Sequence, residues 1–222
     1  MIREELGKVN VKKYEYSFGE EIANATSHGP MAALALLALP YVAVKAYIKG
    51  GVLDSVGVSV FVISVFLMLL ASTLYHSMSE GTRHKQIFKI LDHIFIYVAI
   101  AGTYTPIALS IIGGWQGILI TIIQWGMVLF GILYKSLSKK SIPKVSLTIY
   151  LVMGWTIIFF LPIFLAKSPV LLSVFITIGG VLYSMGAYFY AKKGFKYHHM
   201  VWHFFVNLGA LSHFIGIVFF LR

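Results

Sequence analysis

The sequence predicts an all-α integral membrane protein, folded as one bundle of seven transmembrane helices over residues 1–222. Composition is the first observation: 59% of the residues are hydrophobic and only 12% are charged, whereas soluble domains carry about 25% charged residues. The second is a series of long apolar runs, each long enough to cross a hydrocarbon layer of about 30 Å. The loops between these runs are short, so no second domain is expected.

The spans are predicted in chain order from their apolar bodies. Residues 1–19 are polar, and Ser17 with Glu20 fits a capping box, so the first helix is expected to begin near residue 18. Pro106 and Pro162 predict kinks, either packed or acting as hinges. The seven apolar bodies are predicted at 22–48, 56–78, 88–112, 117–134, 145–166, 170–191 and 198–221.

The basic residues set the predicted orientation. With seven spans, fourteen lysines and arginines fall on the side of the N-terminus, and four fall on the other side: Lys45, Lys49, Lys167 and Arg222. Lys and Arg concentrate in cytoplasmic loops, so the N-terminus and residues 1–19 are expected in the cytoplasm and the C-terminus outside. The net charge of +10 is therefore attributed to basic loops facing anionic lipids of the cell membrane, and not to nucleic-acid binding.

Polar residues from several spans are predicted to lie at one depth near the cytoplasmic side. His199 and His203 are four residues apart, which places both rings on one helix face. His76, near the end of the second span, and Asp92, near the start of the third, fall at the same level, and Ser72 shares a face with His76. Ionisable residues inside a membrane are costly and are functional candidates by default.

Three neutral imidazoles suit a zinc ion and leave a fourth position for water. His76, His199 and His203 are therefore the candidate Zn²⁺ ligands. Asp92 is the candidate general base or hydrogen-bond partner of a ligand, and Ser72 could bind the water or a substrate carbonyl. The chain has no cysteine, so thiolate ligands are excluded.

Three other histidines are interpreted separately. His28, a turn or two into the first span, is a candidate partner that supports a metal-ligating histidine, or an alternative ligand itself. His213, near mid-membrane, is expected to make a hydrogen bond between helices. His198, at the membrane interface, is expected to be solvated.

These residues resemble the signature of the progestin and adipoQ receptor family, which is shared with alkaline ceramidases. The signature positions are Ser72-x3-His76, Asp92 and His199-x3-His203, and the bacterial hemolysin III branch is most similar in context. That context comprises Glu20-Glu21-Ile22-Ala23-Asn24, Ser27-His28-Gly29, Leu91-Asp92-His93 and Ala101-Gly102-Thr103-Tyr104-Thr105-Pro106. The resemblance implies seven helices with an inside N-terminus. It also implies zinc held at His76, His199 and His203 with Asp92 close by through water and, from the receptor members, hydrolysis of ceramide-type lipid amides.

Three functions follow as alternatives. The first is a zinc-dependent intramembrane hydrolase that acts on a lipid amide or ester and contributes to bacterial membrane homeostasis. The second is a membrane sensor or receptor-like protein whose zinc is structural, with His28 closing the coordination sphere. The third is a pore-forming cytolysin of the hemolysin III type, although few charged residues lie deep in any span. Membrane lipids are the expected partners in all three.

Overall fold

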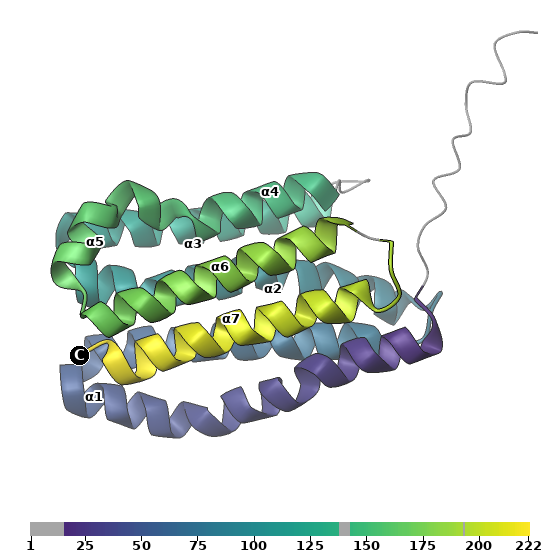
Figure 1. Cartoon of the computed structure of the whole chain (residues 1–222), viewed down its shortest axis with the longest axis horizontal. Helices are drawn as coiled ribbons and strands as arrows, with labels where there is room; N and C mark the ends of the chain where they lie inside the picture. Colours follow the sequence, from purple (N-terminus) through teal and green to yellow (C-terminus); the bar gives the residue numbers. More distant parts are fainter. Residues whose placement is uncertain (1–15, 138–142, 193) are drawn as a thin grey trace, which may run out of the picture.

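The computed structural model describes residues 16–137, 143–192 and 194–222, and these residues form helices and turns but no strand. The helices lie side by side with similar axis directions and form one elongated bundle (Figure 1). Six of them are long and apolar enough to cross a membrane. Residues 1–15 of the predicted polar segment 1–19 lie outside the described residues.

The first helix, α1 (Phe18–Ser77), begins where the sequence predicts and contains a reversal. Ser17 and Glu20 make both hydrogen bonds of the capping box. A straight helix of 60 residues would be about 90 Å long. At Gly51 the backbone leaves the helix with φ of 75°, a value that favours glycine. The Ser55 hydroxyl donates to the carbonyl of Ala43 across this bend, and α1 then doubles back on itself (Figure 1).

The following segment is continuous but changes its helical form at proline. It consists of α2 (Arg83–Pro106) and a π-helix, η1 (Ile107–Ile112). Gly113 ends the π-helix, and α3 (Gly114–Leu137) begins at the next residue. Pro106 is buried against the backbone of α1, where a Cβ added to Gly57 would lie 3.0 Å from the Pro106 Cα. The kink expected at this proline is therefore packed.

The predicted fifth span is interrupted. It is divided into α4 (Pro143–Gly154), a 3-10 helix η2 (Thr156–Phe160) and α5 (Leu161–Lys167). Pro162 at the start of α5 has no N–H to donate to the preceding turn. The Tyr104 hydroxyl compensates at the break, since it donates to the Gly154 carbonyl at 2.7 Å and accepts from the Ile157 N–H at 2.9 Å.

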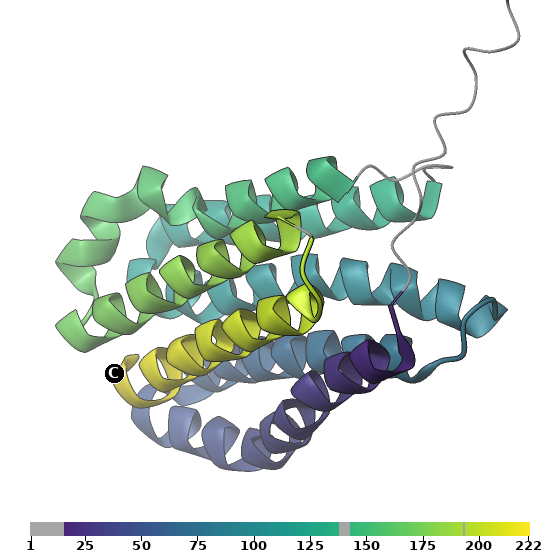
Figure 2. The same ribbon diagram turned by 45° about the vertical axis from the view of Figure 1, so that its right-hand side comes forward.

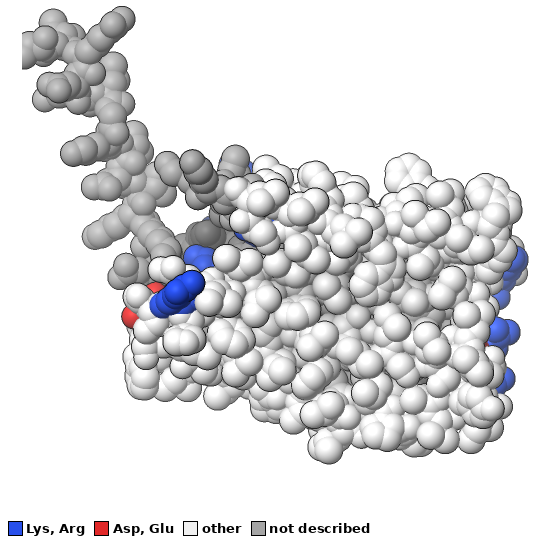
Figure 3. Space-filling view, turned by 180° about the vertical axis from the view of Figure 1, so that it is seen from behind, with Lys and Arg blue, Asp and Glu red and all other residues white. Residues whose placement is uncertain are grey.

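The last two helices complete the bundle. They are α6 (Val170–Lys192) and α7 (His198–Phe220), and α7 lies beside the first half of α1 (Figures 1 and 2). On the face seen in Figure 3, Lys, Arg, Asp and Glu lie near the two ends, and a broad band without them separates the ends. That band has the character of a surface in contact with lipid.

Candidate metal centre

Three histidines that are far apart in the sequence meet inside one end of the bundle. His76 comes from the last turn of α1, and His199 and His203 come from the first two turns of α7. Their side chains are buried, with exposed fractions of 3%, 6% and 0%. One ring nitrogen from each lies within 4.8 Å of the others. The predicted ligand set is therefore brought together as a group that could hold a metal ion.

Hydrogen bonds on the outer ring nitrogens orient two of these histidines. The Nδ1 of His76 donates to a carboxylate oxygen of Glu21 at 2.6 Å. The Nδ1 of His203 faces the Ser27 hydroxyl at 2.9 Å and the Asn24 carbonyl at 3.2 Å. Carboxylates and carbonyls only accept, so the proton of each ring is on Nδ1. The Nε2 lone pairs of both rings are then free for a metal ion.

The inner nitrogens lack suitable partners within the protein. The Nε2 atoms of His76 and His199 face each other at 3.2 Å. The Nε2 of His203 is buried and has no hydrogen-bond partner within the described residues. Buried polar atoms are normally paired, and a divalent cation would satisfy all three nitrogens at once. The residues present therefore fit a metal with three imidazole ligands and a further open position.

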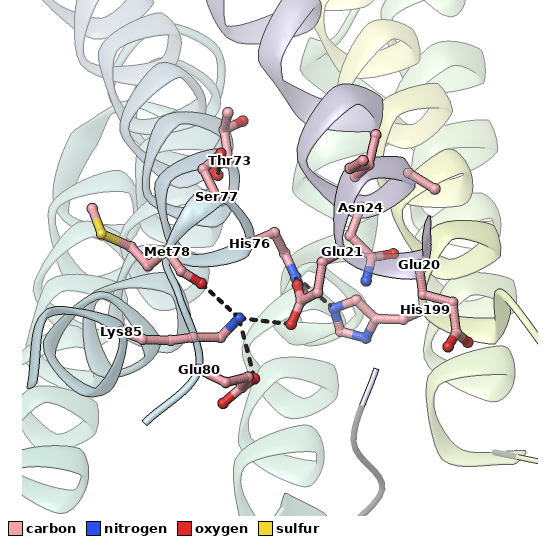
Figure 4. A network of polar contacts seen from close by, with 12 residues as sticks. Glu20, Glu21, Asn24, Thr73, His76, Ser77, Met78, Glu80, Lys85 and His199 are labelled. Carbon is pink, nitrogen blue, oxygen red and sulfur yellow. Dashed lines mark hydrogen bonds and ion pairs between the residues drawn. The ribbon is translucent and has the colours of Figure 1, made fainter. Parts of the chain in front are cut away.

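An ion network around the buried Lys85 supports the centre from the end of the bundle (Figure 4). Lys85, from the first turn of α2, donates to Glu21 at 2.7 Å, to the Met78 carbonyl at 3.1 Å and to Glu80 at 3.2 Å. Glu21 is thus held between a lysine and His76. A carboxylate on the outer nitrogen of a ligating histidine is the usual outer support of a metal site.

The two candidate catalytic residues lie next to the histidines and are not part of the group of three. Ser72 and Asp92 are buried, with exposed fractions of 1% and 5%. Asp92 lies close to Ser72 and His76, and the Ser72 hydroxyl makes no hydrogen bond within the described residues. Their catalytic roles stay predictions.

The remaining predicted histidines have three different outcomes. His28 stacks face to face on His203, with ring centroids 3.8 Å apart, and is not one of the three grouped residues. The hydrogen bond expected for His213 is confirmed, because its Nε2 donates to the Ile176 carbonyl of α6 at 3.1 Å. The prediction that His198 is solvated is wrong: its side chain is 1% exposed, because the turn before α7 folds it under Phe195, whose carbonyl lies 3.1 Å from its Nδ1.

The supporting residues were not assigned a role from the sequence. In the sequence, Glu21 stands out only as part of the family context, and Lys85 only as one of the fourteen basic residues on the side of the N-terminus. One signal was available: Glu21, Asn24 and Ser27 recur at three-residue steps on one face of the first helix, and an acidic residue entering a membrane needs a partner.

The fold and the site together define a multi-pass membrane protein with a buried three-histidine centre at one end of its bundle. Comparison with known sequences agrees with this class and narrows it. The model of the family described as "Haemolysin-III related" matches residues 16–214, and the chain belongs to this family.

Two bacterial relatives are similar over nearly their whole length. The "Hemolysin-3 homolog" of Bacillus subtilis is 38% identical over 206 residues, which cover 92% of this chain and 96% of that protein. The "Hemolysin-3" of Bacillus cereus is 37% identical over 202 residues, covering 90% and 91%. A more distant relative of this chain is the human "Monocyte to macrophage differentiation factor", which belongs to the progestin and adipoQ receptor family. It is 27% identical over 165 residues, which cover 68% of this chain and 64% of that protein.

Proposed function

We propose that this protein is a zinc-dependent hydrolase that cleaves an acyl amide or ester bond of a membrane lipid inside the cell membrane. The observation that carries the proposal is the convergence of one ring nitrogen from each of three buried histidines, with the Glu21 carboxylate in contact with one of them. Three nitrogen ligands with an open position are typical of catalytic zinc, whereas structural zinc normally has four protein ligands. Zinc is the proposed metal because three imidazoles form one of its catalytic ligand sets.

The proposal includes seven crossings with a cytoplasmic N-terminus. The reversal at Gly51 supports counting α1 twice, since Glu21 and His76 from its two ends are in contact. The distribution of lysine and arginine supports the orientation. The histidines then lie in the cytoplasmic half of the membrane, where lipid headgroups join acyl chains.

Each side chain near the histidines has a definite role in this proposal. Zinc, when bound, would polarise a carbonyl and lower the pKa of water towards about 7. Asp92 accepts a proton from the attacking water and returns it to the leaving group. Ser72 donates a hydrogen bond to the substrate carbonyl, and Glu21 keeps His76 in its Nδ1–H form. Burial of the site limits access of bulk water.

A sensor with structural zinc is the second candidate, and His28 favours it. Both ring nitrogens of His28 are buried and have no hydrogen-bond partner within the described residues. If the ring turned from its stacked position, it could supply a fourth ligand. Replacing His28 by Ala would then weaken zinc binding strongly. If the protein is a hydrolase with three histidine ligands, the same replacement should lower zinc affinity only modestly. A cytolysin of the kind that the Bacillus relatives' names suggest would instead cause liposome leakage that survives the double variant His76→Ala, His203→Ala.

The deciding experiment starts with zinc content. Elemental analysis of purified wild type is expected to give about one zinc per chain, which His199→Ala loses. His213→Ala is the matched control, because His213 is also buried in α7 but lies outside the cluster. Wild type, His199→Ala and Asp92→Asn are then incubated with N-acyl and O-acyl lipids. Hydrolysis by wild type alone supports the proposal, and zinc-loaded wild type that cleaves neither class contradicts it.

A further inference from the structure

A groove opens on the side of the bundle between α1 and α7, next to the metal centre. It has a volume of about 380 Å³ and is lined by Ser27 from α1 and by Met200, Val201, Phe204 and Asn207 from α7. Its α7 wall is apolar apart from Asn207. Phe204 is 58% exposed, and it belongs to the apolar run that we assign to the hydrocarbon layer. The groove therefore opens sideways towards lipid chains.

The floor of the groove carries an unused hydrogen-bond acceptor. The side-chain N–H of Asn207 donates to the Ser27 carbonyl at 2.8 Å, which fixes the orientation of the amide. Its Oδ1 is buried and has no hydrogen-bond partner within the described part of the chain. A buried acceptor without a donor is rare in folded proteins, and this one belongs to a residue that lines the groove. A bound molecule with an N–H or O–H group would supply the missing donor.

The groove shares a wall with the metal centre. Asn207 follows His203 by one helical turn, an axial distance of about 6 Å. Ser27 contacts both residues, since its carbonyl accepts from Asn207 and its hydroxyl lies 2.9 Å from the Nδ1 of His203. A lipid lying in the groove would therefore contact Ser27, the residue that separates the groove from His203.

We infer that this groove binds the acyl chain of a membrane lipid that enters between α1 and α7, and that Asn207 selects lipids with a hydrogen-bond donor at the head of the chain. The N–H of an N-acyl amide meets this requirement, whereas a simple O-acyl ester has no donor. The inference rests on the proposed function for the chemistry that follows binding, but binding itself requires no hydrolysis.

Photo-crosslinking tests the inference on the full chain in nanodiscs of phosphatidylethanolamine and phosphatidylglycerol. The probes are an N-acyl amide lipid and the matching O-acyl ester without a hydroxyl, each with a diazirine in the acyl chain. The amide probe is expected to label peptides containing Ser27 and residues 200–207. Labelling spread evenly over the lipid-facing helices would overturn the inference.

Three variants separate the parts of the inference. Val201→Trp fills the groove and is expected to reduce labelling by both probes at least tenfold. Leu211→Trp is the control, because Leu211 is 43% exposed on the same helix and does not line the groove. Asn207→Leu should weaken the amide probe about tenfold and leave the ester unchanged. Equal labelling of the two tryptophan variants would show that the acyl chain does not bind in the groove. An unchanged preference for the amide probe in Asn207→Leu would show that Asn207 does not select lipids with a donor. If Asn207→Leu does not fold, the tryptophan pair still decides the site.

The experiments distinguish a failure of the groove inference from a failure of the hydrolase proposal. His199→Ala removes a metal ligand outside the groove and is expected to keep the labelling. Labelling of the groove without any hydrolysis by wild type would contradict the hydrolase alone. Hydrolysis by wild type without labelling of the groove would contradict this inference alone.

Discussion

The Nδ1 of His76 and a carboxylate oxygen of Glu21 lie 2.6 Å apart, although 55 residues separate them within α1. The contact joins the two ends of this helix and orients the ring of a candidate metal ligand. Glu21 is in turn held by Lys85. A single carboxylate therefore connects the fold of α1 to the chemistry of the centre.

Replacing this carboxylate by an amide should weaken metal binding without unfolding the protein. Glu21→Gln is expected to lower zinc affinity about 10- to 100-fold, the usual cost of losing an outer partner of a ligating histidine. Competition with a fluorescent zinc chelator measures the change. Glu80→Gln is the control, because Glu80 also contacts Lys85 but is 59% exposed and makes no ion pair with a histidine among the residues that the structure describes. Equal affinities for Glu21→Gln and wild type would show that the contact does not support the centre.

Removing the metal should lower thermal stability. A ligand at a hundred times its Kd stabilises the folded state by about 2.7 kcal/mol. For a chain of this size, that corresponds to a loss of about 5 to 10 °C in Tm on chelation. Differential scanning fluorimetry in detergent measures the shift, and zinc should restore it. His203→Ala should be insensitive to the chelator, and a comparable shift in that variant would place the stabilising metal elsewhere.

The bend of α1 should require glycine at position 51. Alanine at φ of 75° and ψ of −161° costs about 1 to 3 kcal/mol. A Cβ at Gly51 would contact nothing within 4 Å, so the cost of Gly51→Ala is conformational. Gly126→Ala is the control, since that site is equally open but lies within regular α3. It should be neutral or stabilising by up to about 1 kcal/mol. Unfolding free energies in mixed micelles compare the two, and equal values would contradict the prediction.

Tyr104 should stabilise the broken fifth segment through its hydroxyl. Tyr104→Phe leaves the Gly154 carbonyl and the Ile157 N–H without their partner. The expected destabilisation is about 1 to 3 kcal/mol. Hydrogen exchange should also accelerate at Ile157 relative to wild type. Tyr47→Phe, at a side chain that is 57% exposed, should change neither quantity, and an unchanged Ile157 in Tyr104→Phe would show that the hydroxyl is not needed.

Local features of the chain were predictable from the sequence alone. The helical class follows from composition and from the length of the apolar runs. The start of α1 follows from Ser17 and Glu20, whose hydrogen bonds join residues three apart. His199 and His203 share a face because of the helical period. His76 joins this candidate ligand set because its predicted depth in the membrane matches theirs and because of the family resemblance. The structure brings all three histidines together.

Contacts between distant segments were decided by the tertiary structure. The pairing of Glu21 with His76 depends on the bend at Gly51 and on the packing of α2, which delivers Lys85. The sequence predicted one continuous fifth span, but the structure interrupts it where Tyr104 from another helix replaces the missing backbone bonds. His198 is buried because of a turn that its own helical pattern does not reveal. Helical period and hydropathy depend on neighbouring residues, whereas hydrogen bonds and burial between helices depend on how the whole chain packs.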